Sequence, residues 1–548
     1  MSALREQISH LIKGDVADDE ETLAKYSRDT SIFERKPSLV VFPKNADDIV
    51  ALIRFANTAR ERGESISLTA RSAGTDMSGG PLTDSVVVSF TKYMNHIVDV
   101  GSDYAIAESG TYYRDFEKVT LAKTGKLLPP YPASREIAAL GGMIADNAGG
   151  ELTLRFGKMD RYVRELDVVL SDGSEATLRP LSSQELAAKE TQKDLEGKIY
   201  REIHALIEKN AAEIEAARPT VSKNSSGYAL WNVRSQTRNT FDLTQLITGS
   251  QGTLGFITRA KLGLEKQEPH RGMLVMFISD LNVLPEIVRR VRAFEPESFE
   301  SYDDNTFKLA TRFAGDFLKQ MGFLDTIRLG LAFLPEIWMT ISGGVPKLVL
   351  LAEFAEHSEA EAREKVQKAQ KALEGLRVKT RLAFGMMEEK YWKIRRESFA
   401  LLRKHIHGLR AAPFIDDIVV HTGDYPTFLP ELKSLLLQYN IMYTIAGHIG
   451  DGNFHIIPLV DLKRPEHHKT ILELTPKVYE LVGRYKGSIS GEHNDGIIRT
   501  PYLPLMFSPR MIELFTEVKK IFDPQNIFNP GKKTGGSMKD IETYMIKR

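Results

Sequence analysis

The alternation of apolar and polar residues near the N-terminus predicts short buried strands separated by a helix and a loop. Residues 39–42 form an apolar strand, and a helix is predicted from the capping residue Asn45 to Gly63. The apolar positions of this helix, spaced so as to share one face, are Ile49, Val50, Ile53 and Ala56. Further strands are predicted at 65–70 and 86–89. The predicted order is strand, helix, strand, glycine-rich loop, strand.

The pattern changes twice farther along the chain. A second glycine-rich region at 140–150 precedes a strand at 165–170, and a charged helical stretch runs from 183 to 217. After about Leu264 glycine becomes sparse, and amphipathic helices alternate with short strands. A last helix is predicted at 509–522. The pattern indicates an α+β fold, and the length of 548 residues favours two or more domains.

The most apolar part of the chain, residues 329–354, is interrupted by Pro335, Glu336, Pro346 and Lys347. No continuous run reaches the length that spans a bilayer, so a buried core segment with a turn is the first interpretation. Contact of this segment with a membrane surface is the alternative. Residues 1–13 lack the pattern of a signal peptide, which predicts a cytoplasmic location, with peripheral membrane contact left open.

Composition and charge narrow the possible chemistry. Lys plus Arg equals Asp plus Glu at 73 each, so no net charge favours nucleic acid or an anionic membrane as a partner. The chain contains no cysteine, which excludes disulfides, thiol nucleophiles and cysteine-ligated metal centres. A metal site in this chain would have to use histidine and carboxylate ligands.

The loop at 71–80 has the composition of a phosphate-binding loop. Glycines at 74, 79 and 80 would let backbone amides approach a ligand, while Thr75 and Ser78 offer hydroxyl groups and Arg71 a positive charge. A plain surface loop is an equally weighted alternative for this segment taken alone. The loop matches neither the dinucleotide-binding pattern nor the P-loop pattern, which disfavours nicotinamide and ATP as ligands.

Histidines and a carboxylate gather in two glycine-framed motifs near the C-terminus. Residues 447–455 read Gly-His-Ile-Gly-Asp-Gly-Asn-Phe-His, and Gly491 precedes Glu492 and His493. Two imidazoles and one carboxylate would suit Zn²⁺, Mn²⁺ or Fe²⁺ acting as a Lewis acid. The alternative is that these are ordinary hydrogen-bonded histidines, but three of the 13 histidines in two such motifs weigh against it.

Taken together, these motifs resemble the FAD-linked oxidases with a flavin domain of the vanillyl-alcohol-oxidase (PCMH) type, in the branch of the D-lactate, glycolate and D-2-hydroxyglutarate dehydrogenases. The resemblance covers residues 38–531. The cofactor-binding residues it implies are Arg71, Ser72, Ala73, Gly74, Thr75, Asp76, Ser78, Gly79, Gly80, Pro132, Ser134, Gly141, Gly142, Asn147, Gly149, Gly249, Gly252, Thr253, Gly255, Ile257 and Asn529. Relatives with covalent flavin carry a histidine near Thr75, so the resemblance implies noncovalent FAD.

The resemblance also assigns roles in the chemistry. His448, His455 and Glu492 would bind the metal, His493 would be the general base, and Asn453 would orient substrate or ligands. A 2-hydroxy acid would chelate the metal, which lowers its hydroxyl pKa, and hydride would pass from C2 to flavin N5. Asp451 and Asp495 are candidates for holding the imidazoles.

The family segment Trp-x-x-Arg-Glu points to Arg396 as a clamp for the substrate carboxylate. A solvated arginine on a charged helix is an equally weighted alternative. Residues 413–417 lack the substrate-binding lysine of some relatives, and His421 stands where proline is frequent. The sequence therefore leaves the identity of the 2-hydroxy acid open.

The expected architecture has a two-subdomain FAD domain, an α+β cap domain with an antiparallel sheet, and a closing C-terminal segment. The expected boundaries are a helical segment at 1–35, the FAD domain at 36–265, the cap at 266–485 and the closing segment at 486–548. Electrons would leave to a quinone, a cytochrome or an electron-transfer flavoprotein, and a homodimer is left open. The competing hypotheses are a metal-free FAD oxidase of alcohols or sugar lactones, and a non-catalytic flavin relay subunit.

Overall fold

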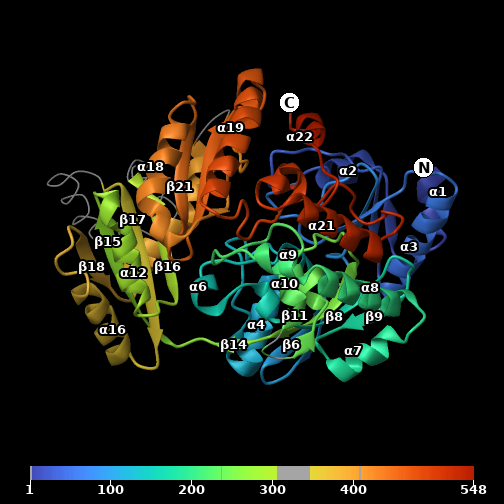
Figure 1. Ribbon diagram of the computed structural model, residues 1–548, viewed down its shortest axis with the longest axis horizontal. Coiled ribbons are helices and arrows are strands. Elements are labelled where there is room, and N and C mark those ends of the chain that lie inside the picture. Colours follow the sequence, from blue (N-terminus) through green and yellow to red (C-terminus); the bar gives the residue numbers. More distant parts are fainter. Residues whose placement is uncertain (1–2, 236, 238, 305–345, 406–408, 548) are drawn as a thin grey trace.

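Two lobes lie side by side in the computed structural model (Figure 1), which describes residues 3–235, 237, 239–304, 346–405 and 409–547. The lobe on the right of Figure 1 contains the N-terminal half of the chain together with the C-terminal helices, so segments far apart in sequence share it. The lobe on the left is built around an eight-stranded sheet.

A four-stranded mixed sheet opens the right-hand lobe, with strand order β1-β2-β4-β3. The strands are β1 (Asp15–Ala17), β2 (Leu39–Phe42), β3 (Leu68–Arg71) and β4 (Val86–Ser89), and the helices beside them are α1 (Ala3–Ser9), α2 (Glu20–Tyr26) and α3 (Ala46–Glu61). Strand β4 pairs in parallel with both β2 and β3, and β1 pairs antiparallel with β2. Leu39, Val41 and Val88 are fully buried in one cluster with Ile49 and Ile53 of α3, so the apolar face of this helix covers the sheet.

A five-stranded antiparallel sheet forms the second half of this lobe, in the order β5-β6-β13-β8-β9. Its strands are β5 (Ile97–Val100), β6 (Tyr104–Glu108), β8 (Val163–Val169), β9 (Glu175–Leu178) and β13 (Phe256–Gly263). The helices of this part of the chain are α4 (Tyr113–Thr124), α5 (Leu140–Asp146), α6 (Thr153–Phe156), α7 (Ser183–Glu190), α8 (Leu195–Lys209), α9 (Ala211–Ala216), α10 (Leu230–Val233) and α11 (Thr244–Ile247). Short paired strands complete it: β7 (Lys126–Leu127) with β14 (Glu265–Lys266), and β10 (Leu181–Ser182) and β11 (Arg234–Ser235) with β12 (Thr240–Phe241).

The left-hand lobe is an antiparallel sheet with helices on both faces. Its strands are β15 (His270–Ile278), β16 (Ser298–Asp303), β17 (Leu348–Glu356), β18 (Lys379–Ala383), β19 (Arg410–Ala411), β20 (Ile418–Val419), β21 (Met442–His448) and β22 (Asn453–Val460). Successive residues of a strand point to opposite faces. Leu274 and Met276 therefore belong to the core formed with α12 (Leu284–Arg292), α16 (Glu359–Lys371), α18 (Tyr425–Leu436) and α19 (Pro465–Arg484), whereas Val275 packs with Trp392 of α17 (Met386–His405) on the other face.

After α19 the chain returns to the right-hand lobe. The returning helices are α20 (Gly496–Arg499), α21 (Pro509–Phe522) and α22 (Met538–Tyr544), drawn in red beside the blue N-terminal segments in Figure 1. The Asn494 amide donates to the carbonyl oxygen of Gly249 over 2.9 Å, and the Lys519 ammonium donates to the carbonyl oxygens of Thr253 and Phe528. The buried bonds to Gly249 and Thr253 attach the C-terminal segment to a loop of the N-terminal half.

The strand and helix expectations agree well with the observed elements. The main difference is β3, which begins at Leu68 and not at residue 65, since residues 65–67 precede the pairing with β4. Of the apolar stretch at 329–354, residues 329–345 lie outside the described residues, and Leu348 begins the buried strand β17. Within the described residues no helix is long and apolar enough to cross a membrane.

Two buried carboxyl groups of the cap, those of Glu388 and Glu353, are expected to make the stability of the protein depend on pH. Burial and a hydrogen bond with Glu353 raise the pKa of Glu388 from 4.5 to about 8. Because the folded pKa is raised, the stabilisation is fully present below pH 4.5 and is lost as the pH rises through 8. We expect thermal unfolding of Glu388→Gln to depend less on pH than that of the parent between about pH 5 and 8. The exposed neighbour Glu389→Gln serves as control, and equal slopes for parent and Glu388→Gln would contradict the expectation.

Candidate active site

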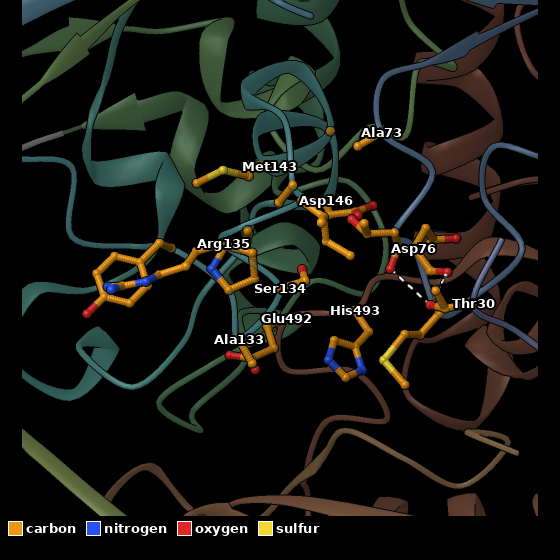
Figure 2. A pocket seen from close by; sticks show the side chains of 18 of the residues that line it. Thr30, Ala73, Asp76, Ala133, Ser134, Arg135, Met143, Asp146, Glu492 and His493 are labelled. Carbon is orange, nitrogen blue, oxygen red and sulfur yellow. Dashed lines mark hydrogen bonds between the residues drawn. The ribbon is translucent and has the colours of Figure 1, made fainter. Parts of the chain in front are cut away.

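A cavity of about 820 Å³ lies between the glycine-rich loops of the right-hand lobe and the cap (Figure 2). Residues with a predicted cofactor role that line it are Arg71, Ser72, Ala73, Gly74, Thr75, Asp76, Gly80, Pro132, Ser134, Gly141, Gly142, Gly149, Gly252, Gly255 and Ile257. The other predicted residues do not line it: Ser78, Gly79, Asn147, Gly249, Thr253 and Asn529. The three loops that the sequence singled out therefore meet at one cavity.

Two residues that do not line the cavity, Asn529 and Asn147, form hydrogen bonds with the backbone around it. The Asn529 amide donates to the carbonyl oxygens of Gly80 and Gln251, over 2.9 and 2.8 Å, and so holds the first loop against the third. Asn147 ends α5 with a φ of 51°, and its side chain accepts a hydrogen bond from the amide of Asp160. Neither side chain lines the cavity, and their role in cofactor binding stays a prediction.

Two aspartates from other parts of the chain, Asp29 and Asp146, lie near Asp76 of the first loop, and the sequence of the loop did not predict them. Asp76 accepts hydrogen bonds from the backbone amides of Gly80 (2.6 Å) and Ser78 (3.2 Å), which folds the loop on itself. Burial and the nearby Asp76 raise the pKa of Asp146 well above its usual range, and raise that of Asp29 to about 8. Arg71 lines the cavity, but its guanidinium donates to the carbonyl oxygens of Arg28 and Tyr26.

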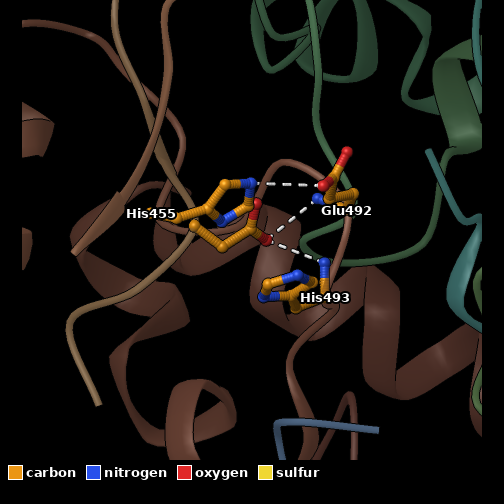
Figure 3. Close-up of side chains that lie close together, drawn as sticks. His455, Glu492 and His493 are labelled. Carbon is orange, nitrogen blue, oxygen red and sulfur yellow. Dashed lines mark hydrogen bonds and ion pairs between the residues drawn. The ribbon is translucent and has the colours of Figure 1, made fainter. Parts of the chain in front are cut away.

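The histidine motifs come together at the cap side of the same cavity (Figure 3). The Glu492 Oε1 atom lies 3.2 Å from His448 Nε2 and 3.4 Å from His455 Nε2. Ligand atoms bound to one ion at ~2.1 Å in a tetrahedral arrangement lie ~3.4 Å apart. The distance from Glu492 Oε1 to each of the two imidazole nitrogens is therefore compatible with a divalent metal ion bound between them.

On the side away from Glu492, each of these two imidazoles contacts one carboxylate. His448 Nδ1 lies 2.5 Å from Glu300 Oε1, and His455 Nδ1 lies 3.1 Å from Asp416 Oδ1. Burial opposes a charged imidazole, but Asp416 offsets this and raises the pKa of His455 to about 10. Such carboxylates fix the tautomer that presents Nε2 to a metal. The imidazole partners are thus Glu300 and Asp416, and not the expected Asp451 and Asp495.

His493 stands next to this cluster with one ring nitrogen held by the protein. Its Nδ1 lies 3.0 Å from Asp416 Oδ2, and its ring stacks on that of His455 with centroids 5.1 Å apart. Burial lowers the pKa of His493, but Asp417 and Asp416 raise it above its usual value overall. The side chain lines the cavity, as Figure 2 shows. With Nδ1 turned to Asp416, Nε2 is the nitrogen left for exchange of a proton.

Asp417 organises the cluster from behind. Its ligand atom lies within 4.8 Å of those of His455, Glu492 and His493, so it is a further candidate metal ligand. However, its Oδ2 accepts from the amides of Glu492 and His493, and its Oδ1 accepts from the Asn453 amide. These bonds engage both oxygens of Asp417, whereas His448 lies outside this group of four. Asn453 is fully buried and does not line the cavity, so it orients Asp417 and not a substrate.

A buried lysine completes the surroundings of Glu492. Lys223 is fully buried, and its Nζ lies 3.1 Å from Glu492 Oε2 and 3.3 Å from Asp451 Oδ2. Burial raises the pKa of Glu492, but Lys223 and His448 offset this and hold that pKa well below its usual range. Lys223, Glu300 and Asp416 were all missed from the sequence, where nothing marks them beyond the acidic pair at 416–417 just before β20.

Two adjacent arginines of α17 reach different parts of the cavity wall. Arg395 lies 3.1 Å from Glu300 Oε2, and so contacts the carboxylate that holds His448. Arg396 forms a two-bond ion pair with Glu151 and stacks on the Trp392 ring. Arg396 therefore lines the cavity, as the clamp hypothesis requires, but it already has a carboxylate partner.

The fold and the cavity define an FAD-binding oxidoreductase. Residues 37–179 match the family described as FAD binding domain, and residues 267–533 match that described as FAD linked oxidases, C-terminal domain. The chain belongs to the FAD-linked oxidases.

Curated relatives are identical to this chain at about a quarter of the aligned positions. D-2-hydroxyglutarate dehydrogenase of Escherichia coli (strain K12) is 28% identical over 540 residues, which cover 95% of this chain and 50% of the relative. The chain thus spans about half the length of the first curated relatives it matches. D-lactate dehydrogenase of Archaeoglobus fulgidus is 27% identical over 502 residues, 90% of each chain. Glycolate oxidase subunit GlcD of Bacillus subtilis is 24% identical and covers 92% of this chain and 91% of its own.

Solved structures share the fold at low sequence identity. 4-Ethylphenol oxidase from Gulosibacter chungangensis, in an isoeugenol complex, superposes with a TM-score of 0.68 at 15% identity, over 98% of this chain and 99% of its own. p-Cresol methylhydroxylase with substrate bound gives 0.67 at 14% identity, over 98% and 96%. Both likenesses support the PCMH-type α+β fold that the sequence predicted.

The bonds of Asn529 lead to a prediction about cofactor affinity. Asn529→Ala removes two buried hydrogen bonds between the first and third loops, worth together ~1–3 kcal/mol. We expect FAD affinity to fall by about tenfold, because the loops then lose part of their preorganisation. Titration of the apoprotein with FAD measures the effect. Asn95→Ala, an exposed site in the same lobe, is the control, and equal affinities for the two variants would contradict the prediction.

Proposed function

We propose that this protein is an FAD-dependent dehydrogenase of a D-2-hydroxy acid, D-lactate-like in class, which oxidises the acid to the 2-oxo acid and passes its electrons to an external acceptor. The observation that carries the proposal is the convergence of His448, His455 and Glu492, with His493 beside them, on the cavity that the glycine loops line. The relatives that match most of their own length are named D-2-hydroxyglutarate dehydrogenase, D-lactate dehydrogenase and glycolate oxidase subunit GlcD, and these names support 2-hydroxy acids as the substrate class.

Each group of residues has a role in this proposal. FAD, held noncovalently by the loops, supplies the hydride acceptor. A divalent metal, Zn²⁺ in first place with Mn²⁺ or Fe²⁺ as alternatives, supplies a Lewis acid that lowers the pKa of the substrate hydroxyl. His448, His455 and Glu492 would hold that metal, and Glu300 and Asp416 would keep both imidazoles in the binding tautomer.

The proton of the substrate hydroxyl would go to His493. Nδ1 of this ring lies 3.0 Å from Asp416 Oδ2, an ion-pair contact that would leave Nε2 to take the proton, and the side chain lines the cavity. The same carboxylate would then stabilise the imidazolium that forms, since both Asp416 oxygens face imidazoles. The acceptor of the electrons would be a quinone, a cytochrome or an electron-transfer flavoprotein.

The test is anaerobic mixing of the purified holoenzyme with D- and L-lactate, glycolate and D-2-hydroxyglutarate while flavin absorbance is recorded. Bleaching by a D-acid that a metal chelator abolishes, and that added Zn²⁺ or Mn²⁺ restores, would support the proposal. A bound flavin that none of these acids reduces would overturn it. Bleaching that is insensitive to the chelator would overturn the metal-dependent part alone.

A further inference from the structure

We propose that Glu151 sets the class of substrate side chain: it fills the binding fork of Arg396, so the site takes 2-hydroxy acids with an uncharged side chain and disfavours those with a second carboxylate. This inference rests on the proposed function. It concerns a residue outside the metal cluster, in the loop that follows Gly149 and Gly150 of the second glycine-rich region.

The contact between Glu151 and Arg396 has the geometry of carboxylate recognition. Glu151 Oε1 accepts a hydrogen bond from Arg396 Nη2 over 2.6 Å, and Oε2 accepts one from Arg396 Nε over 3.2 Å. The Tyr131 hydroxyl donates to the same Oε1 over 3.0 Å. Two parallel N–H···O bonds are the arrangement by which arginine binds the carboxylate of a ligand. Glu151 therefore occupies the place that a substrate carboxylate would need on this guanidinium.

The pair also crosses between the two lobes. Arg396 belongs to α17 of the cap and is 52% exposed, while Glu151 belongs to the flavin-side loop and is 16% exposed. Both residues line the cavity, and Arg396 is further held by the Trp392 ring, 4.6 Å from its guanidinium carbon. A partly buried, doubly bonded pair between fixed elements is displaced less easily than a surface ion pair.

The two arginines of α17 thus divide the cavity. Arg395 contacts Glu300, which holds the metal ligand His448, and so belongs to the end where the hydroxyl and first carboxylate of the substrate would bind. Arg396 takes its partners from the flavin-side loop. Glu151 offsets the charge of Arg396, and Arg135, which also lines this wall, lies 3.7 Å from the carboxylates of Glu117 and Glu136. A second carboxylate here would have to displace Glu151 or lie beside its negative charge.

The prediction is a change of selectivity in Glu151→Gln. Glutamine keeps the size of the side chain and one acceptor for Tyr131, but it removes the charge that competes for Arg396. We expect the ratio of kcat/KM for D-2-hydroxyglutarate to that for D-lactate to rise at least about tenfold over the parent, whose ratio is expected below one. Glu136→Gln, which removes a 72% exposed carboxylate from the same cavity wall, is the matched control, expected to stay within about twofold.

A binding measurement keeps this inference separate from the proposed function. Pyruvate and 2-oxoglutarate are titrated into the holoenzymes, and their dissociation constants are taken from the perturbation of flavin absorbance. If no hydroxy acid reduces the flavin, the proposed function fails, and the two oxo acids still report on Glu151. The role of Glu151 would be refuted if Glu151→Gln changed neither the ratio of the two kcat/KM values nor the ratio of the two dissociation constants, with flavin content and melting temperature as in the parent. A parent that prefers the dicarboxylate would refute it as well.

Discussion

Replacement of His493 by asparagine is expected to lower the rate of substrate-driven flavin reduction by about 10²–10⁴-fold, the usual contribution of a positioned general base. The asparagine amide can still approach Asp416, but it cannot take a proton at neutral pH. Because His493 is a wall residue with no predicted part in holding FAD, flavin content is expected to stay as in the parent. Anaerobic stopped-flow mixing with the best substrate measures the rate.

The control for this variant is His468→Asn. His468 belongs to α19, and its Nε2 atom lies 2.7 Å from the carbonyl oxygen of Leu462. A rate within threefold of the parent in His493→Asn, at full flavin content, would assign the proton to another group. A loss of flavin would place His493 among the residues that hold the cofactor.

Glu492→Gln is expected to lower metal affinity by more than about 100-fold, since even residues that only orient a ligand contribute 10–100-fold. Both His448 Nε2 and His455 Nε2 approach the Oε1 atom of this residue, so its charge is shared by the whole donor set. Competition with a chromophoric chelator measures the affinity of the folded holoenzyme for Zn²⁺. Flavin reduction is expected to fall in parallel.

A second variant separates metal loss from local destabilisation. Glu492→Gln removes one of the two anionic partners of the buried Lys223 and leaves it only Asp451. His455→Gln leaves Lys223 fully paired, and should lose the metal to a similar extent. Unaltered Zn²⁺ affinity in both variants would exclude this cluster as the metal site.

The sequence was a good guide wherever a residue type is required by local geometry. Glycines in the three loops mark places where backbone must approach a ligand or turn tightly. The same constraint applies in the histidine motif at 447–455. Gly452 has a φ of 76°, and a Cβ there would lie 1.9 Å from the carbonyl oxygen of Val420. Such positions leave a trace in the sequence, which is why the motif around His448 and His455 was recognisable.

No sequence motif marks the carboxylates that contact these histidines. Glu300 holds His448 across 148 residues because β16 pairs with β21, Ser301 opposite Gly447. Asp416 reaches His455 because β20 pairs with β22. Either carboxylate, seen in the sequence alone, is one of 73 acidic residues. Glu151 follows a recognisable glycine pair, but its role depends on Arg396, 245 residues away.

The sequence by itself therefore determined the family, the glycine-rich loops that meet at the cavity, the candidate metal-ligand motifs and the order of most strands and helices. These depend on local backbone geometry, side-chain chemistry and the periodicity of apolar residues. Only the tertiary structure decided which carboxylates hold the imidazoles, that Asn453 and Asn529 act from behind the cavity, and that Arg396 is paired with Glu151. Those outcomes depend on strand register and on the contact between two lobes, which bring together side chains hundreds of residues apart.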